Sequence, residues 1–433
     1  MSEQQIQSIA GTEDVLPSQW AYWRRLYGAA ERLFERYGYG RIRTPVLEER
    51  RLFIKGTGET TDVVQKEMYT IPSGGDEDDP ADGVSLRPEG TPPVIRSYLE
   101  HSLHKGQTFR KLYYVGPMFR HERPQRGRLR QFHQLGVEAV GSASPLLDVE
   151  TILLAAGIFR EAGLEGFETY VNSMGCSECR PGIRDRLREL LRGREEELCG
   201  DCVRRLDRNV FRVLDCKKEP CRQVTADLPP ITGMLCEDCS AHHDAVRRGL
   251  EREGATFQED PHLVRGLDYY TRTVYEIKHP SLGARDTICG GGRYDDLVEL
   301  LGGPSLPCVG FAIGAEPTLL AMEAELGPAP EQAPAPEVYI VCFEDEVREE
   351  CFALAGELRR AGVSADLDYE GRSAKSQMRV ADRSGAPLCF LIGGREVENE
   401  EALIKDMATG EQWTAPRREA AEAVRSYLSD KGG

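Results

Sequence analysis

The sequence lacks any segment suited to crossing a membrane or directing secretion. No apolar run in its 433 residues approaches the roughly 20 residues that a membrane-spanning helix needs. The first residues, MSEQQIQSIAGTEDVLP, contain neither the basic stretch nor the apolar stretch of a secretory signal. We therefore expect a cytoplasmic protein that does not engage a membrane.

A net positive charge is lacking as well. The chain has 55 Lys and Arg against 72 Asp and Glu, for a formal net charge of −17. This balance argues against nonspecific coating of DNA, although one basic patch can still attract a nucleic acid if the acidic groups face elsewhere. The composition, 40% hydrophobic and 29% charged, is that of a soluble globular protein. The length allows two or three domains, each with its own core.

The common glycine-rich nucleotide signatures are also missing. The stretch TICGGGRYDDLVELLGG (287–303) has neither the Lys–Ser/Thr ending of a P-loop nor the spacing of a dinucleotide fingerprint. Its three consecutive glycines indicate instead a place where the backbone comes close to another group. Alone, this stretch identifies no function.

Cysteine, by contrast, is abundant. Thirteen cysteines in a large chain without a secretory signal indicate reduced thiols or metal ligands rather than disulfides. Eight of them form four pairs: Cys176/Cys179, Cys199/Cys202, Cys216/Cys221 and Cys236/Cys239. Three pairs have the C-x-x-C spacing that lets two thiolates reach one tetrahedral Zn²⁺.

The cysteine pattern favours zinc, as two four-cysteine sites or as one site with spare thiols. The alternative is a set of reduced cysteines in a helical domain, and an iron–sulfur cluster or a redox relay is less favoured. His242 and His243 lie beside the last pair, and we expect them on a helix surface.

Changes in composition divide the chain into segments. Residues 327–336, GPAPEQAPAP, contain four prolines and predict an exposed linker. Residues 176–258 are richer in Cys, Arg and Glu than their flanks and predict a cysteine-rich helical insertion. We therefore expect a first domain made of 1–175 and 259–326, interrupted by the insertion, and a C-terminal domain at 337–433.

Both domains combine helices and strands. The first domain has strand-like segments joined mostly by turns or loops, at 111–119, 134–141, 167–174, 271–279 and 308–314. This order predicts an α+β core with an antiparallel sheet and flanking helices. In the C-terminal domain strands alternate with helices, and a hairpin is expected around Thr409–Gly410. That pattern predicts a small α/β domain with a largely parallel sheet.

Positive charge is concentrated in FRHERPQRGRLRQFHQLGVEAVG (119–141). The stretch has five arginines from Arg120 to Arg130 and one acidic residue, Glu122. We expect two strands joined by a basic loop, and on the second strand a period of two places four residues on one face: Phe132, Gln134, Gly136 and Glu138. Such a face suits a small polar molecule, and the loop suits phosphates or RNA. The alternative is an exposed basic hairpin.

A second polar stretch is SLRPEGTPPVIRSYLEH (85–101). Arg87, Glu89 and Thr91 alternate in it, and Pro92–Pro93 then start a helix. This stretch predicts either part of a binding site or an ordinary strand–turn–helix junction.

A third polar stretch is LVRGLDYYTRTVYE (263–276). Its arginine, aspartate and paired tyrosines are unusually polar for a core junction. The alternative interpretation is a structural ion pair between Arg265 and Asp268.

Taken together, these stretches resemble the histidyl-tRNA synthetase family of class II aminoacyl-tRNA synthetases. Five segments match in order: GTEDVLP (11–17), LRPEGT (86–91), GPMFRHERPQRGRLRQFHQLG (116–136), RGLDYY (265–270) and GGGRYDDL (290–297). RSAKSQMRVADRSGA (372–386) looks like the family's anticodon-binding domain. The resemblance covers nearly the whole chain. It implies a homodimer that activates histidine with ATP and Mg²⁺ to histidyl-adenylate and transfers it to the 3′ end of tRNA(His).

The resemblance also implies roles for individual residues. Those expected to hold histidine are Glu89, Gly90, Thr91, Gln134, Glu138, Tyr269 and Tyr270. Those expected at ATP are Arg120, Glu122 and Phe132, with Phe132 stacked on adenine. Arg120 and Arg265 would stabilise the charge that accumulates on the α-phosphate when a carboxylate attacks it. Arg123 and Gln125 would meet the acceptor end of the tRNA.

One position departs from the family's pattern. In GFAIGAEPTLLAME (310–323), Pro317 stands where the resemblance implies an arginine that faces ATP. Proline cannot supply a charged donor, so this departure slightly favours a second hypothesis. The chain would then be a synthetase-like regulatory subunit of ATP phosphoribosyltransferase, which senses histidine but charges no tRNA.

Other features disfavour the alternatives. The C-terminal domain, the complete RGLDYY and the basic loop argue against the regulatory subunit. A class II synthetase for another amino acid is a third hypothesis, and the expected imidazole-pocket residues Glu138, Tyr269 and Tyr270 argue against it.

Overall fold

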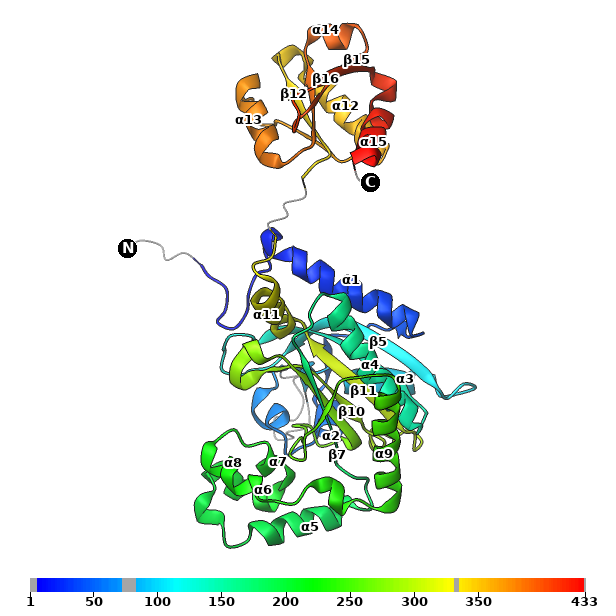
Figure 1. Cartoon of the computed structure of the whole chain (residues 1–433), viewed down its shortest axis with the longest axis vertical. Helices are drawn as coiled ribbons and strands as arrows, with labels where there is room; N and C mark the ends of the chain where they lie inside the picture. The colour runs from blue at the N-terminus through cyan, green and yellow to red at the C-terminus, as the bar shows by residue number, and fades with distance from the viewer. Residues whose placement is uncertain (1–5, 72–82, 331–334, 432–433) are drawn as a thin grey trace, which may run out of the picture. The chain divides into compact units, whose positions relative to one another are not determined.

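A computed structural model describes residues 6–71, 83–330 and 335–431 of the chain. The chain forms two compact units, Met1–Ala329 and Pro330–Gly433, and each is described here by itself (Figure 1). The boundary between them falls within the segment predicted as a linker, 327–336, of which 331–334 lie outside the described residues. Among the described residues no helix combines the length and apolarity that a membrane span requires.

The N-terminal unit is built on an eight-stranded sheet with the order β1-β5-β6-β11-β10-β9-β7-β8. The strands are β1 (Gly40–Arg41), β5 (Arg110–Phe119), β6 (Gln131–Val140), β7 (Glu168–Ser173), β8 (Gln258–Glu259), β9 (Thr271–Lys278), β10 (Thr287–Arg293) and β11 (Cys308–Gly314). Neighbours from β5 to β7 pair antiparallel, and only the short edge strands β1 and β8 pair parallel. The predicted α+β core with an antiparallel sheet is therefore confirmed.

One face of this sheet is covered by four helices, α1 (Trp20–Arg36), α4 (Pro145–Glu161), α9 (Glu237–Arg252) and α11 (Ala315–Leu326). On β6 the buried residues Leu135, Val137 and Ala139 join the apolar core beneath these helices. Because successive side chains on a strand point to opposite faces, the residues between them point to the other side of the sheet. That second face carries the site described below.

The remaining regular elements of the first unit's core are short. They comprise the three-stranded sheet β2 (Leu47–Glu49), β4 (Val84–Leu86) and β3 (Thr70–Ile71), and helices α2 (Arg50–Thr57), α3 (Thr91–Glu100) and α10 (Leu297–Leu300). Single helical turns occupy Pro17–Gln19, Val63–Glu67 and Pro280–Arg285. Helix α3 begins at Thr91, with Pro92 and Pro93 in its first turn, as predicted.

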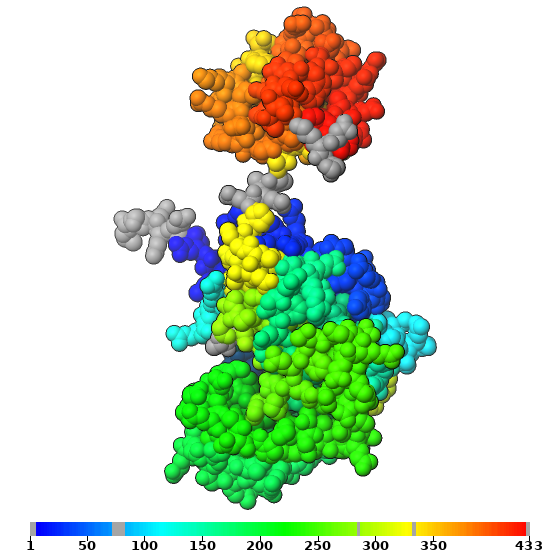
Figure 2. Space-filling view, viewed as in Figure 1, coloured from blue at the N-terminus to red at the C-terminus, as the bar shows by residue number. Residues whose placement is uncertain are grey.

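The segment 176–258 is helical apart from its end at β8. It contains α5 (Arg180–Leu191), α6 (Gly200–Arg208), α7 (Phe211–Leu214), α8 (Glu219–Ala226) and α9, with turns at Glu195–Glu197 and Ile231–Met234. In the space-filling view its green atoms form one continuous lobe of the N-terminal unit (Figure 2). The chain leaves the main sheet at the end of β7 and returns to it at β8.

The C-terminal unit contains a five-stranded sheet with the order β13-β12-β14-β15-β16. Its elements are β12 (Val338–Cys342), α12 (Arg348–Arg360), β13 (Ala365–Leu367), α13 (Ala374–Ser384), β14 (Leu388–Ile392), α14 (Gly394–Glu398), β15 (Glu401–Asp406), β16 (Gln412–Pro416) and α15 (Ala420–Lys431), with turns at Asp345–Val347 and Arg417–Glu419. The first three strands in the sheet order pair parallel, and β15 and β16 form the predicted antiparallel hairpin. Helix α12 ends before Gly362, whose φ of +84° is the left-handed conformation that glycine adopts readily.

A buried ionic network joins β10, α4 and α9. Arg293 pairs with Asp148, and both side chains are fully buried. His242 Nε2 lies 3.3 Å from a carboxylate oxygen of the same Asp148, and His243 lies 3.2 Å from Glu259. The prediction that His242 and His243 lie on a helix surface is therefore wrong, because α9 packs its histidine face against α4 and the sheet.

Arg293→Ala tests this network. Removing one partner of a buried ion pair leaves the other charge uncompensated, so we expect the free energy of unfolding to fall by about 3–5 kcal/mol. Urea unfolding measures the change. Arg36→Ala is the control, since Arg36 is exposed and pairs with Glu161 only at 3.9 Å. Equal effects of the two substitutions would contradict a structural role for the buried pair.

Candidate active site

A cavity of about 160 Å³ lies on the sheet face opposite the covering helices. Seven of its lining residues were singled out from the sequence: Glu89, Thr91, Arg120, Gln134, Arg265, Tyr269 and Tyr270. Gln134 comes from β6, and Arg120 directly follows β5. Glu89 and Thr91 lie at the start of α3, and the other three residues precede β9. The size suits a small molecule rather than a peptide or nucleic-acid segment.

Strand β6 supplies the floor of the cavity. Gln134 lines it, and its Oε1 is buried without a hydrogen-bond partner among the described residues. Glu138, four residues further along the same face, is fully buried and does not line the cavity itself. Gly136 lies between them, and a Cβ there would overlap the ring of Tyr114 on the neighbouring strand β5. The space that a side chain would need at Gly136 is thus filled by a tyrosine ring.

The turn before α3 supplies the second carboxylate. Arg87 is buried and donates to the carbonyls of Thr44 and Pro117, which anchors the turn. Glu89 accepts hydrogen bonds from the hydroxyls of Thr57 and Tyr269. The chain packs closely here, because a Cβ at Gly90 would also overlap the ring of Tyr114.

Thr91 and Tyr294 hold the carboxylate of Glu138. The Thr91 hydroxyl donates to Glu138 over 2.7 Å, and Tyr294 donates to the other oxygen of Glu138. Burial raises the pKa of Glu138 from its usual 4.5 to about 8, although both hydrogen bonds act in the opposite direction. Burial also raises the pKa of Glu89. Burial therefore disfavours the ionised form of both carboxyl groups.

The segment Arg265–Tyr270 forms one wall of the cavity. Arg265 pairs with Glu276 on β9 and lies over the ring of Tyr270 at 5.6 Å. Asp268 instead accepts hydrogen bonds from Thr60 and Asn209, both at 2.7 Å. The alternative interpretation of a structural pair between Arg265 and Asp268 is thus wrong.

The glycine-rich strand β10 accommodates this arginine. A Cβ at Gly290 would overlap the guanidinium of Arg265. The glycines therefore leave room where a side chain approaches the backbone, as the sequence predicted.

The basic loop joins β5 to β6. Arg120 donates to the carbonyl of Pro88 over 2.9 Å and lies over the ring of Phe132 at 5.3 Å. Glu122 pairs with Arg128 at 3.0 Å and lies 4.0 Å from Arg120. Neither Glu122 nor Phe132 lines the cavity itself.

The tip of this loop is a tight turn. Gln125 and Arg128 exchange backbone hydrogen bonds there, and both Gln125 and Arg123 are exposed. Arg130, at the end of the loop, donates to the carbonyl of Ala10 over 3.2 Å. Part of the positive charge thus holds the N-terminal segment rather than facing a ligand.

Pro317 lies in the first turn of α11. It packs beside Gly314 and the loop residue Gly127, where it has no side-chain donor. Its neighbour Glu316 accepts hydrogen bonds from the backbone and ring of His133 on β6, at 2.8–3.0 Å. The start of α11 is therefore tied to the strand that forms the pocket floor.

Three aromatic residues of the cavity, Tyr114, Tyr294 and Phe311, were missed by sequence reasoning. Tyr114 lies on β5 opposite Gly136, and Tyr294 directly follows Arg293. A signal for Tyr114 was available, since a glycine on an otherwise bulky strand face predicts a large neighbour across the sheet. Tyr294 belongs to GGGRYDDL, but only its glycines were interpreted.

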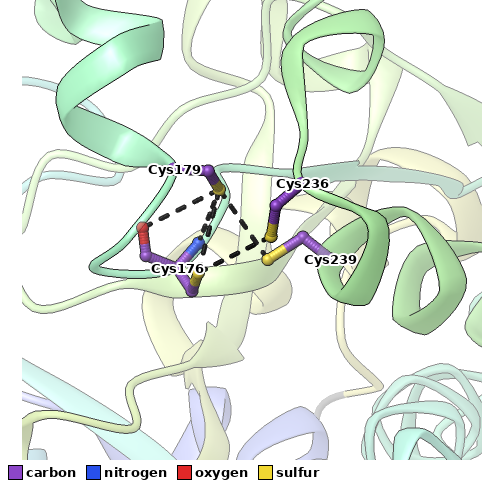
Figure 3. A group of neighbouring side chains, drawn as sticks. All are labelled: Cys176, Cys179, Cys236 and Cys239. Atoms are coloured by element: carbon purple, nitrogen blue, oxygen red, sulfur yellow. Dashed lines mark hydrogen bonds between the residues drawn. The ribbon is translucent and has the colours of Figure 1, made fainter.

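The eight cysteines of the insertion form two separate groups. One contains Cys176, Cys179, Cys236 and Cys239; the other contains Cys199, Cys202, Cys216 and Cys221. In the first group, the sulfur of Cys176 lies 3.8 Å from that of Cys179 and 3.9 Å from that of Cys236 (Figure 3). The sulfurs of Cys179 and Cys239 are 3.8 Å apart. Four thiolates at about 2.3 Å from one tetrahedral Zn²⁺ would lie roughly 3.8 Å apart. The partition leaves no spare thiol among the four pairs.

Comparisons with known proteins agree with the resemblance noted above. A family model described as histidyl-tRNA synthetase matches residues 11–317, and one described as an anticodon binding domain matches 337–427. A histidine–tRNA ligase from Halothermothrix orenii is 45% identical over 407 residues, covering 94% of this chain and 96% of that protein.

Solved structures are similar to this chain as well. The apo histidyl-tRNA synthetase of S. aureus matches with a TM-score of 0.80 and 36% identity, covering 97% of this chain and all of that one. A Bacillus halodurans protein described as an ATP phosphoribosyltransferase regulatory subunit/histidyl-tRNA synthetase matches with a TM-score of 0.64. At 22% identity this second likeness shows the fold alone.

The raised pKa of Glu138 predicts a pH-dependent stability. Between about 4.5 and about 8 the folded protein keeps this proton while the unfolded chain loses it, so rising pH favours unfolding. Glu138→Gln removes this effect. The quantity to compare is the free energy of unfolding of the variant minus that of the parent. We expect this difference to increase from pH 5 to pH 8, by at most about 1.4 kcal/mol per pH unit, and then to level off.

Urea unfolding of both proteins in a pH series measures this difference. Glu165→Gln is the matched control, because the Glu165 side chain is exposed. A constant difference for Glu138→Gln across the series would show that Glu138 is ionised in the empty pocket.

Proposed function

The chain belongs to the histidyl-tRNA synthetase family, and from this premise we propose how its pocket works. The protein is an ATP-dependent histidine–tRNA ligase, which activates histidine to histidyl-adenylate and transfers it to the 3′ end of tRNA(His). The observation that carries our proposal is the grouping of Glu89 with Arg120 and Arg265 around one small cavity. Carboxylates suit the cationic amino acid, and guanidinium groups suit the phosphate.

We propose that histidine occupies the inner part of the cavity. Its ammonium group calls for a carboxylate and hydrogen-bond acceptors, which Glu89, Thr91 and Gln134 supply. The Oε1 of Gln134 supports this role, since a buried acceptor without a partner is completed by a ligand donor. Tyr269 and Tyr270 would face the imidazole, with Glu138 behind them, and Gly90 would leave room for the ring of Tyr114 beside the ligand.

The activation step needs no protein nucleophile. The histidine carboxylate attacks the α-phosphate of ATP, and pyrophosphate leaves. Arg120 and Arg265 would stabilise the charge on the phosphoryl oxygens at the transition state. Arg265 is held by Glu276 and stacked on Tyr270, so its position is fixed before ATP arrives.

ATP would lie over the outer part of the pocket with Mg²⁺ on its phosphates. We propose that Phe132 stacks on the adenine and that Glu122 orients Arg120 beside it. Since Pro317 offers no donor, the arginines of the cavity and the basic loop would supply the protein's own positive charge at the phosphates, in addition to Mg²⁺.

The exposed tip of the basic loop would receive the tRNA. We propose that Arg123 and Gln125 contact the acceptor end, where an exposed guanidinium and an amide can bind phosphate and sugar oxygens. The C-terminal unit would bind the anticodon, in keeping with its family-model match at 337–427. This match also favours the ligase over the regulatory subunit. We further propose that the enzyme is a cytoplasmic homodimer.

We propose Zn²⁺ as the ion of both cysteine groups. Four thiolates, with no further ligand beside them among the described residues, form the closed donor set of a structural zinc site. In each group a backbone N–H also points at a ligand sulfur, from Cys176 to Cys179 over 3.3 Å and from Cys199 to Cys221 over 3.2 Å. Such donors stabilise thiolate charge.

ATP–pyrophosphate exchange with purified protein tests the function. We expect exchange that depends on histidine and not on other amino acids, because Glu89, Tyr269 and Tyr270 line one small cavity of about 160 Å³. Arg265→Ala should lower the exchange rate by at least about 10²-fold, since a fixed donor at the transition state is lost.

Arg110→Ala is the control for that substitution, because Arg110 lies at the far end of β5 and outside the cavity. Histidine binding without exchange in the parent protein would instead support the regulatory hypothesis. Near-normal exchange by Arg265→Ala would rule out the role given to that arginine.

Metal analysis tests the zinc proposal. Protein purified without chelator should contain two zinc ions per chain, measured by plasma mass spectrometry. Cys176→Ser with Cys236→Ser should leave one ion, and so should Cys199→Ser with Cys216→Ser, because the two groups share no ligand. A parent protein that contains no zinc, and takes up none after reduction, would overturn the proposal.

A further inference from the structure

The insertion holds the wall of the histidine pocket at two points. We define the pocket strap as residues Arg265–Tyr270, which end in the two tyrosines of the cavity. Besides contacts from the catalytic core, the strap receives one hydrogen bond from Arg180 and one from Asn209. Both donors lie within the insertion, and each lies close in sequence to one of the cysteine groups.

The first contact ends at the wall of the cavity itself. Arg180 Nη1 donates to the backbone carbonyl of Tyr270 over 2.9 Å. The same guanidinium lies over the ring of Phe211 at 5.5 Å, so it is also packed against helix α7 of the insertion. Arg180 therefore connects the tyrosine of the pocket to the interior of the insertion.

The first cysteine group fixes Arg180. The residue directly follows Cys179 and is the first residue of α5. Cys179 and Cys176 meet Cys236 and Cys239 at the start of α9, 60 residues away in sequence. A Cβ at Gly175 would lie 2.6 Å from the sulfur of Cys179, so the chain makes a close turn around this group. A metal ion there would set where α5 starts and hence where Arg180 points.

The second contact holds the middle of the strap. Asn209 Nδ2 donates to Asp268 over 2.7 Å. Asn209 lies between Cys202 and Cys216, two members of the second cysteine group. A metal ion in that group would close the loop that carries Asn209.

We propose that the insertion sets the histidine affinity of the pocket by holding the strap at Tyr270 and Asp268, with the two metal sites keeping Arg180 and Asn209 in place. Arg180 and Asn209 are positioning residues, since neither lines the cavity. The inference rests on the proposed zinc sites and histidine pocket. It gives the insertion a role within histidine recognition itself, as distinct from any contact with tRNA.

Three substitutions in zinc-loaded protein test the proposal. Arg180→Ala and Asn209→Ala should each weaken histidine binding by about 5- to 10-fold, the effect of one lost hydrogen bond. Isothermal titration calorimetry with histidine measures the dissociation constant. Arg186→Ala is the matched control, because Arg186 is exposed on the same helix and pairs only with Glu189 in the described structure.

Further measurements distinguish a role of Arg180 and Asn209 in positioning the pocket strap from a loss of the fold. The zinc content should stay unchanged in both variants. The KM for ATP should change less than the dissociation constant for histidine, since the two contacts end at Tyr270 and Asp268 rather than at Arg265. Arg180→Lys should recover most of the affinity, because an ammonium can still donate to the carbonyl of Tyr270.

The outcomes separate this proposal from those it rests on. Unchanged histidine affinity in Arg180→Ala and Asn209→Ala, with two zinc ions bound, would overturn the coupling and leave the zinc proposal intact. Weaker binding in both variants of a protein that holds no zinc would support the strap contacts and overturn the metal's part in them. A parent protein that binds no histidine would overturn the proposed function itself.

Discussion

Strand β6 presents an apolar face to the helices and a polar face to the pocket, and the fold of the N-terminal unit depends on both faces being correctly placed. Its apolar residues, such as Val137, must be buried beneath the helices, while Gln134 and Glu138 must face polar partners. Because neighbouring side chains point to opposite sides, a slip of one residue would drive Glu138 into the apolar core. Pairing with β5 on one side and β11 on the other holds the register.

The polar face is arranged before any ligand arrives. Glu89 and Glu138 are buried among hydroxyl donors, and Arg265 is held by Glu276. Burial raises the pKa of both carboxyl groups, and a cationic ligand beside them would favour their ionised forms. Gln134 offers an acceptor that no described residue satisfies. These features fit a pocket that is completed by its substrate.

Local features of the fold were readable in the sequence because they depend on neighbouring residues. Alternation identified the face of β6 that carries Gln134 and Glu138, and paired prolines marked the start of α3. Thr409–Gly410 marked a hairpin turn, where Gly410 has a positive φ. The resemblance to a family added roles for residues, and the structure brings seven of those residues to one cavity. Their roles stay predictions until they are measured.

The sequence by itself determined which segments are strands and helices and which of their faces are polar, because periodicity and turn residues act over a few positions. Only the tertiary structure decided which partners meet. The cysteine spacing left the grouping open, and folding joined Cys176 to Cys236 across 60 residues. Likewise Arg265 pairs with Glu276 rather than Asp268, and His242 is buried against Asp148. Such choices depend on how whole helices and strands pack, since contacts between distant residues form only when the core that carries them is assembled.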